Sequence, residues 1–240
     1  MRVIAITPTA DRPKAFALSE RWMKRQTRQP DSWVISDGGK VPAEPTTVPT
    51  RHVTKYVEDV HLNFVGNVLR GLACARGADA VLFWEDDDWY GPRHIEDCVA
   101  RLESGAMIVG SIQQRYYNVK SREWNQFRNA GSCFCQTAIS TALTPLLFQA
   151  AAMAISEDSA GIDGRLWALA REAGVKEDNF EGPGHVLGIK GVEGKLGIGM
   201  GHRPDSQFTP DPGLDKLREW IGDDAEVYQE FQSKEGKPWR

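Results

Sequence analysis

The sequence predicts an α/β fold in which helices flank a mostly parallel, Rossmann-like central sheet. In the first hundred residues, short apolar or β-branched runs alternate with segments of helical periodicity, as in parallel βαβ units. A second observation concerns one strand end, where the apolar run 81–84 meets four consecutive acids at 85–88. Ligand sites in open α/β sheets lie just beyond the carboxyl ends of strands. A chain of 240 residues is long enough for one sizeable domain of this kind.

Each element of the first half follows from a local pattern. The β-branched run 3–7 predicts a strand ended by Pro8, and a helix follows with Asp11 as its cap and Pro13 in its first turn. Residues 32–36 predict a second strand, which the turn Asp37-Gly38-Gly39 closes. We expect a short strand at 52–56, a helix at 63–76, the acidic strand, and a helix at 92–102.

The second half is less regular. We expect a strand at 106–112, helices at 142–155 and 165–173, and a charged helical tail from residue 214. The apolar run 186–189 lies within a glycine-rich stretch at 182–201. Because no internal repeat or linker divides the chain, we expect a single domain over residues 1–240.

Composition excludes several classes of protein. The formal net charge of −4 gives no polybasic signature for nucleic acid or anionic membranes. The spacing of Cys133 and Cys135 does not suit a zinc knuckle and favours reduced thiols over a disulfide. No run approaches the ~18 to 20 apolar residues of a membrane span. The amino terminus lacks a signal-peptide core, so we expect a cytoplasmic location.

The acidic run is the strongest functional signal. Adjacent carboxylates repel one another, and a carboxylate taken out of water needs a partner. Hard oxygen ligands suit Mg²⁺ or Mn²⁺, and such a cation could neutralise a diphosphate, which points to nucleotide chemistry. The alternative is a solvated acidic turn. Because the run directly follows a strand, we favour the metal.

Three motifs together resemble those of a glycosyltransferase of the GT-A fold, close to family 2. They are Thr-Pro-Thr-Ala-Asp-Arg-Pro at 7–13, Ser-Asp-Gly-Gly at 36–39 and Phe-Trp-Glu-Asp-Asp-Asp at 83–88. Each follows a predicted strand, in the order the family has. The resemblance implies a single GT-A-like domain with a nucleotide-sugar-binding half at 1–105, an acceptor half at 106–210 and a helical tail at 211–240.

The resemblance also implies roles for residues of the first half. The nucleotide pocket would be lined by Thr7, Pro8, Thr9 and Arg12. Asp37 would accept a hydrogen bond from the base, although Asp-Gly-Gly is equally well explained as a turn. In the acidic motif Glu85 stands where the family has its first Asp, which leaves the register open by one residue. Glu85 or Asp86 would contact the ribose, and the metal would be held by Asp87, with Asp88 as the next candidate.

Candidates in the second half rest on looser likeness. Asp163 stands where the family often has an acid leading a helix, which makes it the candidate general base; the alternative is a helix cap, and Glu157 and Asp158 are rivals. His202 could complete the metal shell and would favour Mn²⁺, with His185 a weaker candidate. Among the aromatic residues, we expect Trp89 and one of Trp84, Tyr116, Tyr117 and Trp124 to reach the site.

The implied activity is metal-dependent transfer of a sugar from a nucleotide-diphosphate sugar, a UDP-sugar by resemblance, to an acceptor hydroxyl with inversion. The acceptor stays open among a saccharide, a protein and a modified nucleobase. Transfer to a hydroxylated DNA base would use a basic groove, for which Arg115, Lys120, Arg122 and Arg128 are candidates. A nucleotidyltransferase and a non-catalytic nucleotide-sugar-binding protein are the alternatives from other classes.

Overall fold

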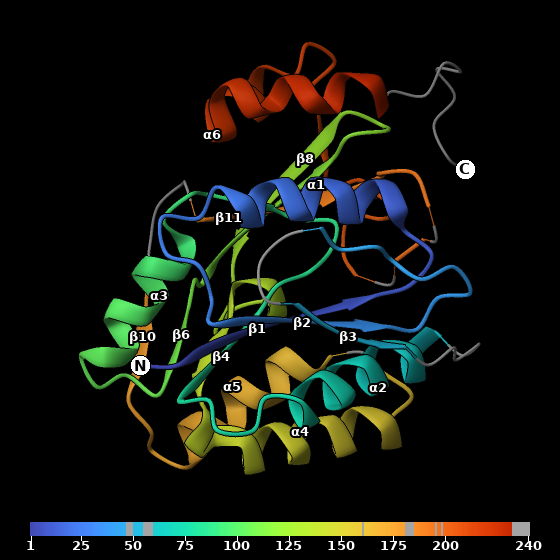
Figure 1. The fold of residues 1–240 in the computed structure, drawn as a ribbon. Helices are drawn as coiled ribbons and strands as arrows, with labels where there is room; N and C mark the ends of the chain where they lie inside the picture. The colour runs from blue at the N-terminus through green and yellow to red at the C-terminus, as the bar shows by residue number, and fades with distance from the viewer. Residues whose placement is uncertain are drawn as a thin grey trace.

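The computed structural model describes residues 1–46, 50–54, 60–159, 161–180, 185–194, 196–197 and 199–231. Within these ranges a seven-stranded sheet has the order β10-β6-β9-β4-β1-β2-β3 (Figure 1). Its strands are β1 (Val3–Thr9), β2 (Ser32–Asp37), β3 (Thr50–Thr54), β4 (Ala80–Phe83), β6 (Ile108–Gly110), β9 (Ala138–Ser140) and β10 (Glu177–Asn179). β4, β1, β2 and β3 run parallel to one another, whereas β9 runs antiparallel to β4 and β6. The expected mostly parallel sheet is confirmed.

Helices cover both faces of this sheet (Figure 1). One face carries α1 (Pro13–Lys24) and α3 (His94–Glu103), and the other carries α2 (Val60–Ala73), α4 (Thr144–Ser156) and α5 (Ile162–Glu172). Because successive side chains of a strand point to opposite faces, β1 contributes to two cores. Val3 and Ala5 join the core under α1 and α3, while Ile4 and Ile6 join the core under α2, α4 and α5.

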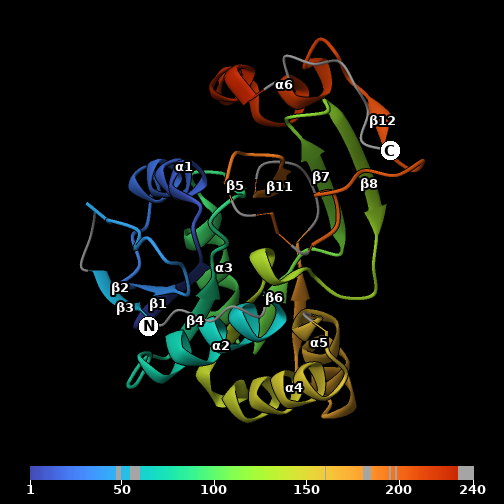
Figure 2. The same ribbon diagram turned by 90° about the vertical axis from the view of Figure 1, so that its right-hand side faces the viewer.

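A second, five-stranded sheet has the order β12-β8-β7-β11-β5 in the described part of the chain. Its strands are β5 (Trp89–Tyr90), β7 (Gln113–Asn118), β8 (Glu123–Arg128), β11 (Val186–Lys190) and β12 (Thr209–Pro210). Figure 2 shows the β7–β8 hairpin leading from the large sheet toward α6 (Asp215–Ile221). The remaining elements are the 3₁₀ segments η1 (Phe134–Gln136), η2 (Thr141–Leu143) and η3 (Gly222–Phe231).

The expected helical tail is found from Asp215 to Phe231, where it packs onto the body of the protein. Residues 232–240 of that expectation lie outside the described residues. Leu217, Trp220 and Tyr228 are buried in the core shared with α1 and α3. Among the described residues, no helix is long and apolar enough to cross a lipid bilayer. All four cysteines carry free thiols, which agrees with the expectation from their spacing.

Two local expectations were wrong. Strand β1 continues through Pro8 to Thr9, since these residues pair with Ser36 and Asp37 of β2. Asp11 does not cap α1; the capping position is occupied by Arg12 without a side-chain hydrogen bond. Asp11 instead adopts φ 51° and accepts hydrogen bonds from the backbone N–H groups of residues 40 and 41.

The β7–β8 hairpin was not predicted from the sequence. The third strand was expected at 52–56 and is found at Thr50–Thr54. Residues 55 and 56 of that expectation lie outside the described residues.

Candidate active site

The acidic loop 85–88 is held at both ends by the two sheets. At one end it follows β4, and the backbone N–H of Trp84 donates to the carbonyl of Ile6, 2.9 Å. At the other end it enters β5, which pairs with β11. The backbone N–H of Glu85 donates to the hydroxyl of Tyr90 at 2.7 Å and closes the loop on itself. The loop is therefore fixed by backbone pairing and not by solvation of its charges.

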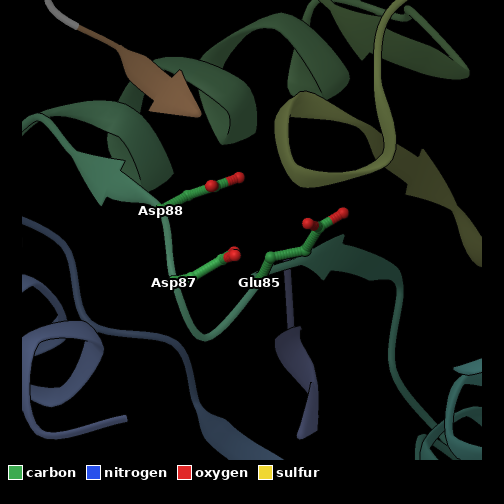
Figure 3. A group of neighbouring side chains, drawn as sticks. All are labelled: Glu85, Asp87 and Asp88. Atoms are coloured by element: carbon green, nitrogen blue, oxygen red, sulfur yellow. The ribbon is translucent and has the colours of Figure 1, made fainter. Parts of the chain in front are cut away.

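Three of the four acids converge on one point. Figure 3 shows the carboxylates of Glu85, Asp87 and Asp88 directed toward a common space, and one oxygen of each lies within 4.8 Å of the others. Asp86 points elsewhere: it accepts a hydrogen bond from the Thr9 hydroxyl at 2.6 Å and pairs with Arg12 at 2.5 Å. Asp86 therefore bonds to the β1–α1 connection, while the other three acids form a cluster that we call the carboxylate cluster.

Two cationic side chains and one imidazole surround these acids. Arg12 bridges Asp86 and Asp87 with its two terminal nitrogens. Lys190, the last residue of β11, places Nζ 3.0 Å from Asp87 Oδ1 and 2.7 Å from Asp88 Oδ1. His202 Nε2 lies 3.3 Å from Asp87 Oδ2. Buried carboxylates are thus paired with cations, as desolvated charges must be.

The acids differ in how these neighbours affect their ionisation. Burial raises the pKa of Glu85 well above its ordinary value, with a further rise from the charge of Asp88. Burial also raises the pKa of Asp86 and of Asp88 to about 6. Burial opposes the ionisation of Asp87 too, but Arg12 and Lys190 outweigh it and hold its pKa well below the usual range. Asp87 is therefore the permanent anion of the group.

The cluster opens into a cavity of about 520 Å³. Both halves of the chain contribute to its wall. From the first half come Pro8, Arg12, Phe64 and the acids Glu85, Asp86, Asp87 and Asp88. From the second half come Tyr116, Cys133, Phe134, Cys135, Asp158, Ser159, Gly161, Asp163, Lys190, Gly197, Gly199, Met200 and His202. A cavity of this size, lined by carboxylates and by apolar surface, is typical of a small-molecule site.

Asp163 faces this cavity from the first turn of α5. It does not occupy the capping position, which belongs to Gly161, and its Oδ1 accepts a hydrogen bond from the backbone N–H of Gly164 at 2.8 Å. Burial raises the pKa of Asp163, a change that makes a carboxylate a better proton acceptor. Its rivals differ: Asp158 also lines the cavity, whereas Glu157 pairs with Arg165.

The model of the family described as glycosyl transferase family 2 matches residues 22–161 of this sequence, which is more than half of the 240-residue chain. The chain belongs to glycosyl transferase family 2. The resemblance inferred from the three motifs is thereby confirmed, and the family assignment decides for a glycosyltransferase over a nucleotidyltransferase. No curated protein matches the sequence.

Solved structures of S. aureus TarS resemble this family 2 chain in fold. TarS residues 1–349 match with a TM-score of 0.50 at 12% identity, covering 79% of this chain and 60% of that one. The same fragment in complex with UDP gives a TM-score of 0.49, again at 12% identity and with the same coverage. A further TarS structure gives 0.36 at 14% identity, covering 50% and 22%. The chain thus spans 60% or less of the TarS chains that it matches.

The carboxylate cluster of this family 2 domain fits a divalent cation. All its donors are hard carboxylate oxygens, which Mg²⁺ and Mn²⁺ prefer. Asp88 Oδ2 is fully buried and accepts no N–H or O–H hydrogen bond from the described residues. The thiol beside it, Cys135, is only a weak donor. A buried acceptor of this kind is suited to ligate a cation.

Four residues expected at the nucleotide or the sugar lie outside the cavity wall, namely Thr7, Thr9, Asp37 and Trp89. The hydroxyl of Thr9 donates to Asp86, as described above. Thr7 is buried and its hydroxyl accepts from the indole N–H of Trp33 at 2.8 Å. Asp37 accepts from the backbone N–H groups of Gly39 and Ala43 at 2.8 and 2.6 Å, the contacts of a turn residue. Trp89 is buried and its indole N–H donates to Asp224 at 2.7 Å. Their roles toward a nucleotide stay predictions.

The glycine-rich segment brings His202 to the cluster. At Gly197 a Cβ atom would overlap the imidazole of His202, so the glycine permits this approach. His185 lies elsewhere, with its ring against Phe180 and Nδ1 3.7 Å from Asp97. Of the two histidines, the structure places only His202 at the acids.

Sequence reasoning missed Lys190. It is 3% exposed and touches the same acids as the expected metal. Its only sequence signal is a cation at the carboxyl end of the apolar run 186–189.

Two of the candidate basic residues of a DNA groove make contacts within the protein. Arg115 is 7% exposed and lies 5.9 Å from the ring of Trp220, and Arg122 donates to the carbonyl of Pro212.

Proposed function

We propose that this chain transfers a sugar from a nucleotide-diphosphate sugar to a hydroxyl group of an acceptor, with the help of a divalent cation. The observation that carries the proposal is the convergence of Glu85, Asp87 and Asp88 at the wall of the cavity. When bound there, the cation would stabilise negative charge on the leaving diphosphate. The proximity of His202 to Asp87 favours Mn²⁺ over Mg²⁺, because imidazole suits Mn²⁺ better.

The cavity wall supports a division of labour between the two halves. Residues 1–105 supply Pro8, Arg12 and the acids, and would bind the donor. Residues 106–210 supply Asp163, Tyr116 and His202, and would bind the acceptor. The family likeness makes a UDP-sugar the donor of choice. It leaves a saccharide, a protein and a modified nucleobase as acceptor classes.

Asp163 would act as the general base of an inverting transfer. The acceptor oxygen attacks the anomeric carbon, the bond from that carbon to the diphosphate oxygen breaks, and the hydroxyl proton passes to the Asp163 carboxylate. Its position in the cavity and its raised pKa both suit proton transfer. Arg12 would hold Asp86 and Asp87 in place throughout, since it contacts both.

A panel of nucleotide sugars tests the proposal, with melting temperature measured with and without Mn²⁺. Stabilisation by one donor that requires the metal is expected, and a panel without any stabilising donor would contradict the function. With the donor identified, Asp163→Asn should lower turnover by ~10² to 10⁴-fold at unchanged donor affinity. Asp158→Asn is the matched control: it also lines the cavity, and Asn tolerates its φ of 48°. Full activity of Asp163→Asn would transfer the role of base to Asp158.

A further inference from the structure

Lys190 stands where a cation bound to the carboxylate cluster would stand. Its ammonium nitrogen lies 3.0 Å from Asp87 Oδ1, 2.7 Å from Asp88 Oδ1 and 3.9 Å from Glu85 Oε2. These are the three residues whose oxygens gather within 4.8 Å of one another (Figure 3). One ammonium group therefore faces every carboxylate that could ligate a metal.

An ammonium and a divalent cation would compete for these carboxylates. Asp87 Oδ1 and Asp88 Oδ1 already accept from Lys190, and a metal bound at ~2.1 Å from either oxygen would lie close to the ammonium nitrogen. Two cations brought that close would also repel each other strongly in a buried site. Binding of a metal to this cluster therefore favours departure of Lys190 from the acids.

The side chain of Lys190 is suited to leave, whereas that of Arg12 is not. Arg12 bridges two acids with a planar guanidinium, a geometry that fixes its position. Lys190 is a point charge on a flexible four-carbon stem, and it forms part of the cavity wall. It is also the last residue of β11, and Gly191 follows with φ 84°. An ammonium released from the acids would remain in the cavity, within reach of an anionic ligand.

One acceptor remains without a strong partner while Lys190 is in place. Asp88 Oδ1 accepts from both Lys190 and the backbone N–H of Ile189, yet Oδ2 accepts no N–H or O–H donor from the described residues. The side chain of Asp88 is 0% exposed. The lysine thus satisfies the cluster only in part.

We propose that Lys190 is a built-in counter-ion of the carboxylate cluster that competes with the divalent cation and is displaced into the cavity when the metal binds. The inference rests on the proposed metal site and adds a residue that controls access to it. Lys190 keeps the donor-free protein folded around its acids. The same residue lowers the affinity of the empty site for metal until a ligand draws the ammonium away.

Mn²⁺ binding to the full chain, measured by calorimetry without any nucleotide, tests the exchange. Lys190→Gln should bind Mn²⁺ at least about tenfold more tightly than the wild type, a change of ~1.4 kcal/mol. The control is Lys176→Gln, because Lys176 is an exposed lysine that donates to the carbonyl of Ser104; its Mn²⁺ affinity should be that of the wild type. Equal affinity of Lys190→Gln and wild type, or binding to neither, would overturn the proposal.

A second measurement uses the wild type and avoids any folding defect of the variant. Acetylation of individual lysines by acetic anhydride, followed by mass spectrometry, reports the accessibility of each ammonium group. Lys190 should react several-fold faster with Mn²⁺ than with chelator, while Lys176 reacts equally in both. An unchanged rate at Lys190 under saturating Mn²⁺ would show that the lysine stays in place and would overturn the exchange.

These outcomes separate the exchange from the proposed function. Tighter Mn²⁺ binding by Lys190→Gln, together with no stabilisation by any nucleotide sugar, would support the exchange and count against the transferase. Metal-dependent stabilisation of the wild type by a nucleotide sugar, together with no effect of Lys190→Gln on Mn²⁺ affinity, would support the transferase and overturn the exchange.

Discussion

Asp87 carries the most cationic neighbours of the four acids, and Asp87→Asn therefore perturbs the site most directly. Its oxygens contact Arg12, Lys190 and His202, and its side chain is 2% exposed. Because Arg12 and Lys190 overcome the effect of burial and lower its pKa, the charged form of Asp87 stabilises the fold at neutral pH. Asp88 is the matched comparison, because burial raises its pKa from 3.8 to about 6.

The expected magnitudes follow from these contacts. Removing one partner of a buried ion pair costs ~3 to 5 kcal/mol when the other partner is left alone. In Asp87→Asn, Arg12 still pairs with Asp86 and Lys190 still pairs with Asp88, so neither cation is left alone. We therefore expect the substitution to lower the free energy of unfolding by ~2 kcal/mol without metal. Holding Asp88 charged costs up to ~3 kcal/mol by its pKa shift, which offsets its lost hydrogen bonds. Asp88→Asn should therefore change stability by less than ~1 kcal/mol.

Urea unfolding in chelator, repeated in Mn²⁺, measures both effects. A ligand that binds only the folded state adds ~2.7 kcal/mol at a concentration of 100 Kd. Under conditions that give the wild type this gain, Asp87→Asn should gain less than ~1 kcal/mol, since an anionic ligand is missing. Wild-type stability and a full Mn²⁺ gain in Asp87→Asn would refute the reasoning. If Asp88→Asn loses more stability and more of the Mn²⁺ gain than Asp87→Asn, then Asp88 and not Asp87 is the main metal ligand.

Three further predictions concern packing, acid stability and the nucleotide pocket. Gly71→Ala should cost ~1 to 3 kcal/mol in urea unfolding because its Cβ would overlap Ile6, whereas Gly164→Ala, with nothing within 4 Å, should stabilise by ~0.5 to 1 kcal/mol; equal effects would contradict the packing of α2 on β1. Burial lowers the pKa of His94 from 6.5 to about 3, so its contribution is present above pH 6.5 and is lost as pH falls toward 3. Replacing His94 with Phe should remove a slope of ~1.4 kcal/mol per pH unit between pH 6 and 4, and parallel curves for the two proteins would count against it. Asp37→Ala should lower stability by ~2 kcal/mol, since two backbone N–H groups lose their acceptor, and should weaken nucleotide binding by ~1 to 3 kcal/mol; unchanged affinity of the folded variant would leave only the turn role.

Local periodicity was enough to predict the part of the fold built from parallel βαβ units. Apolar residues recur at strand or helix spacing in the strands that begin at residues 3, 32 and 80 and in the helices between them. The pattern is clear because each of these elements packs one or two faces into a core. β9 escaped prediction since its three residues carry no period, and only β4 and β6 on either side make it a strand. The β7–β8 hairpin escaped because its strands are largely polar and its turn uses Arg122 at φ 55° in place of Gly or Asn.

The site divides in the same way between local and tertiary causes. The acids at 85–88 could be found from sequence because a carboxylate run at a strand end is a local pattern. The sequence could not predict which of these acids converge. Asp86 turns toward Thr9 and Arg12, while Glu85, Asp87 and Asp88 face the cavity. Which acid stays charged also depends on residues far along the chain, because Arg12 and Lys190 outweigh the effect of burial on the pKa of Asp87.

Strand pairing explains why Lys190 reaches acids more than 100 residues earlier in the chain. β5 directly follows the acidic loop, and β11 pairs with it in the register Leu187 to Trp89. This register places the backbone N–H of Ile189 on Asp88 and carries the next side chain, Lys190, into the carboxylate cluster. Because side chains alternate along a strand, a slip of one residue would send Lys190 to the opposite face and leave the acids without their ammonium. The cation chemistry of the acidic motif is thus set by β11 as much as by the motif itself.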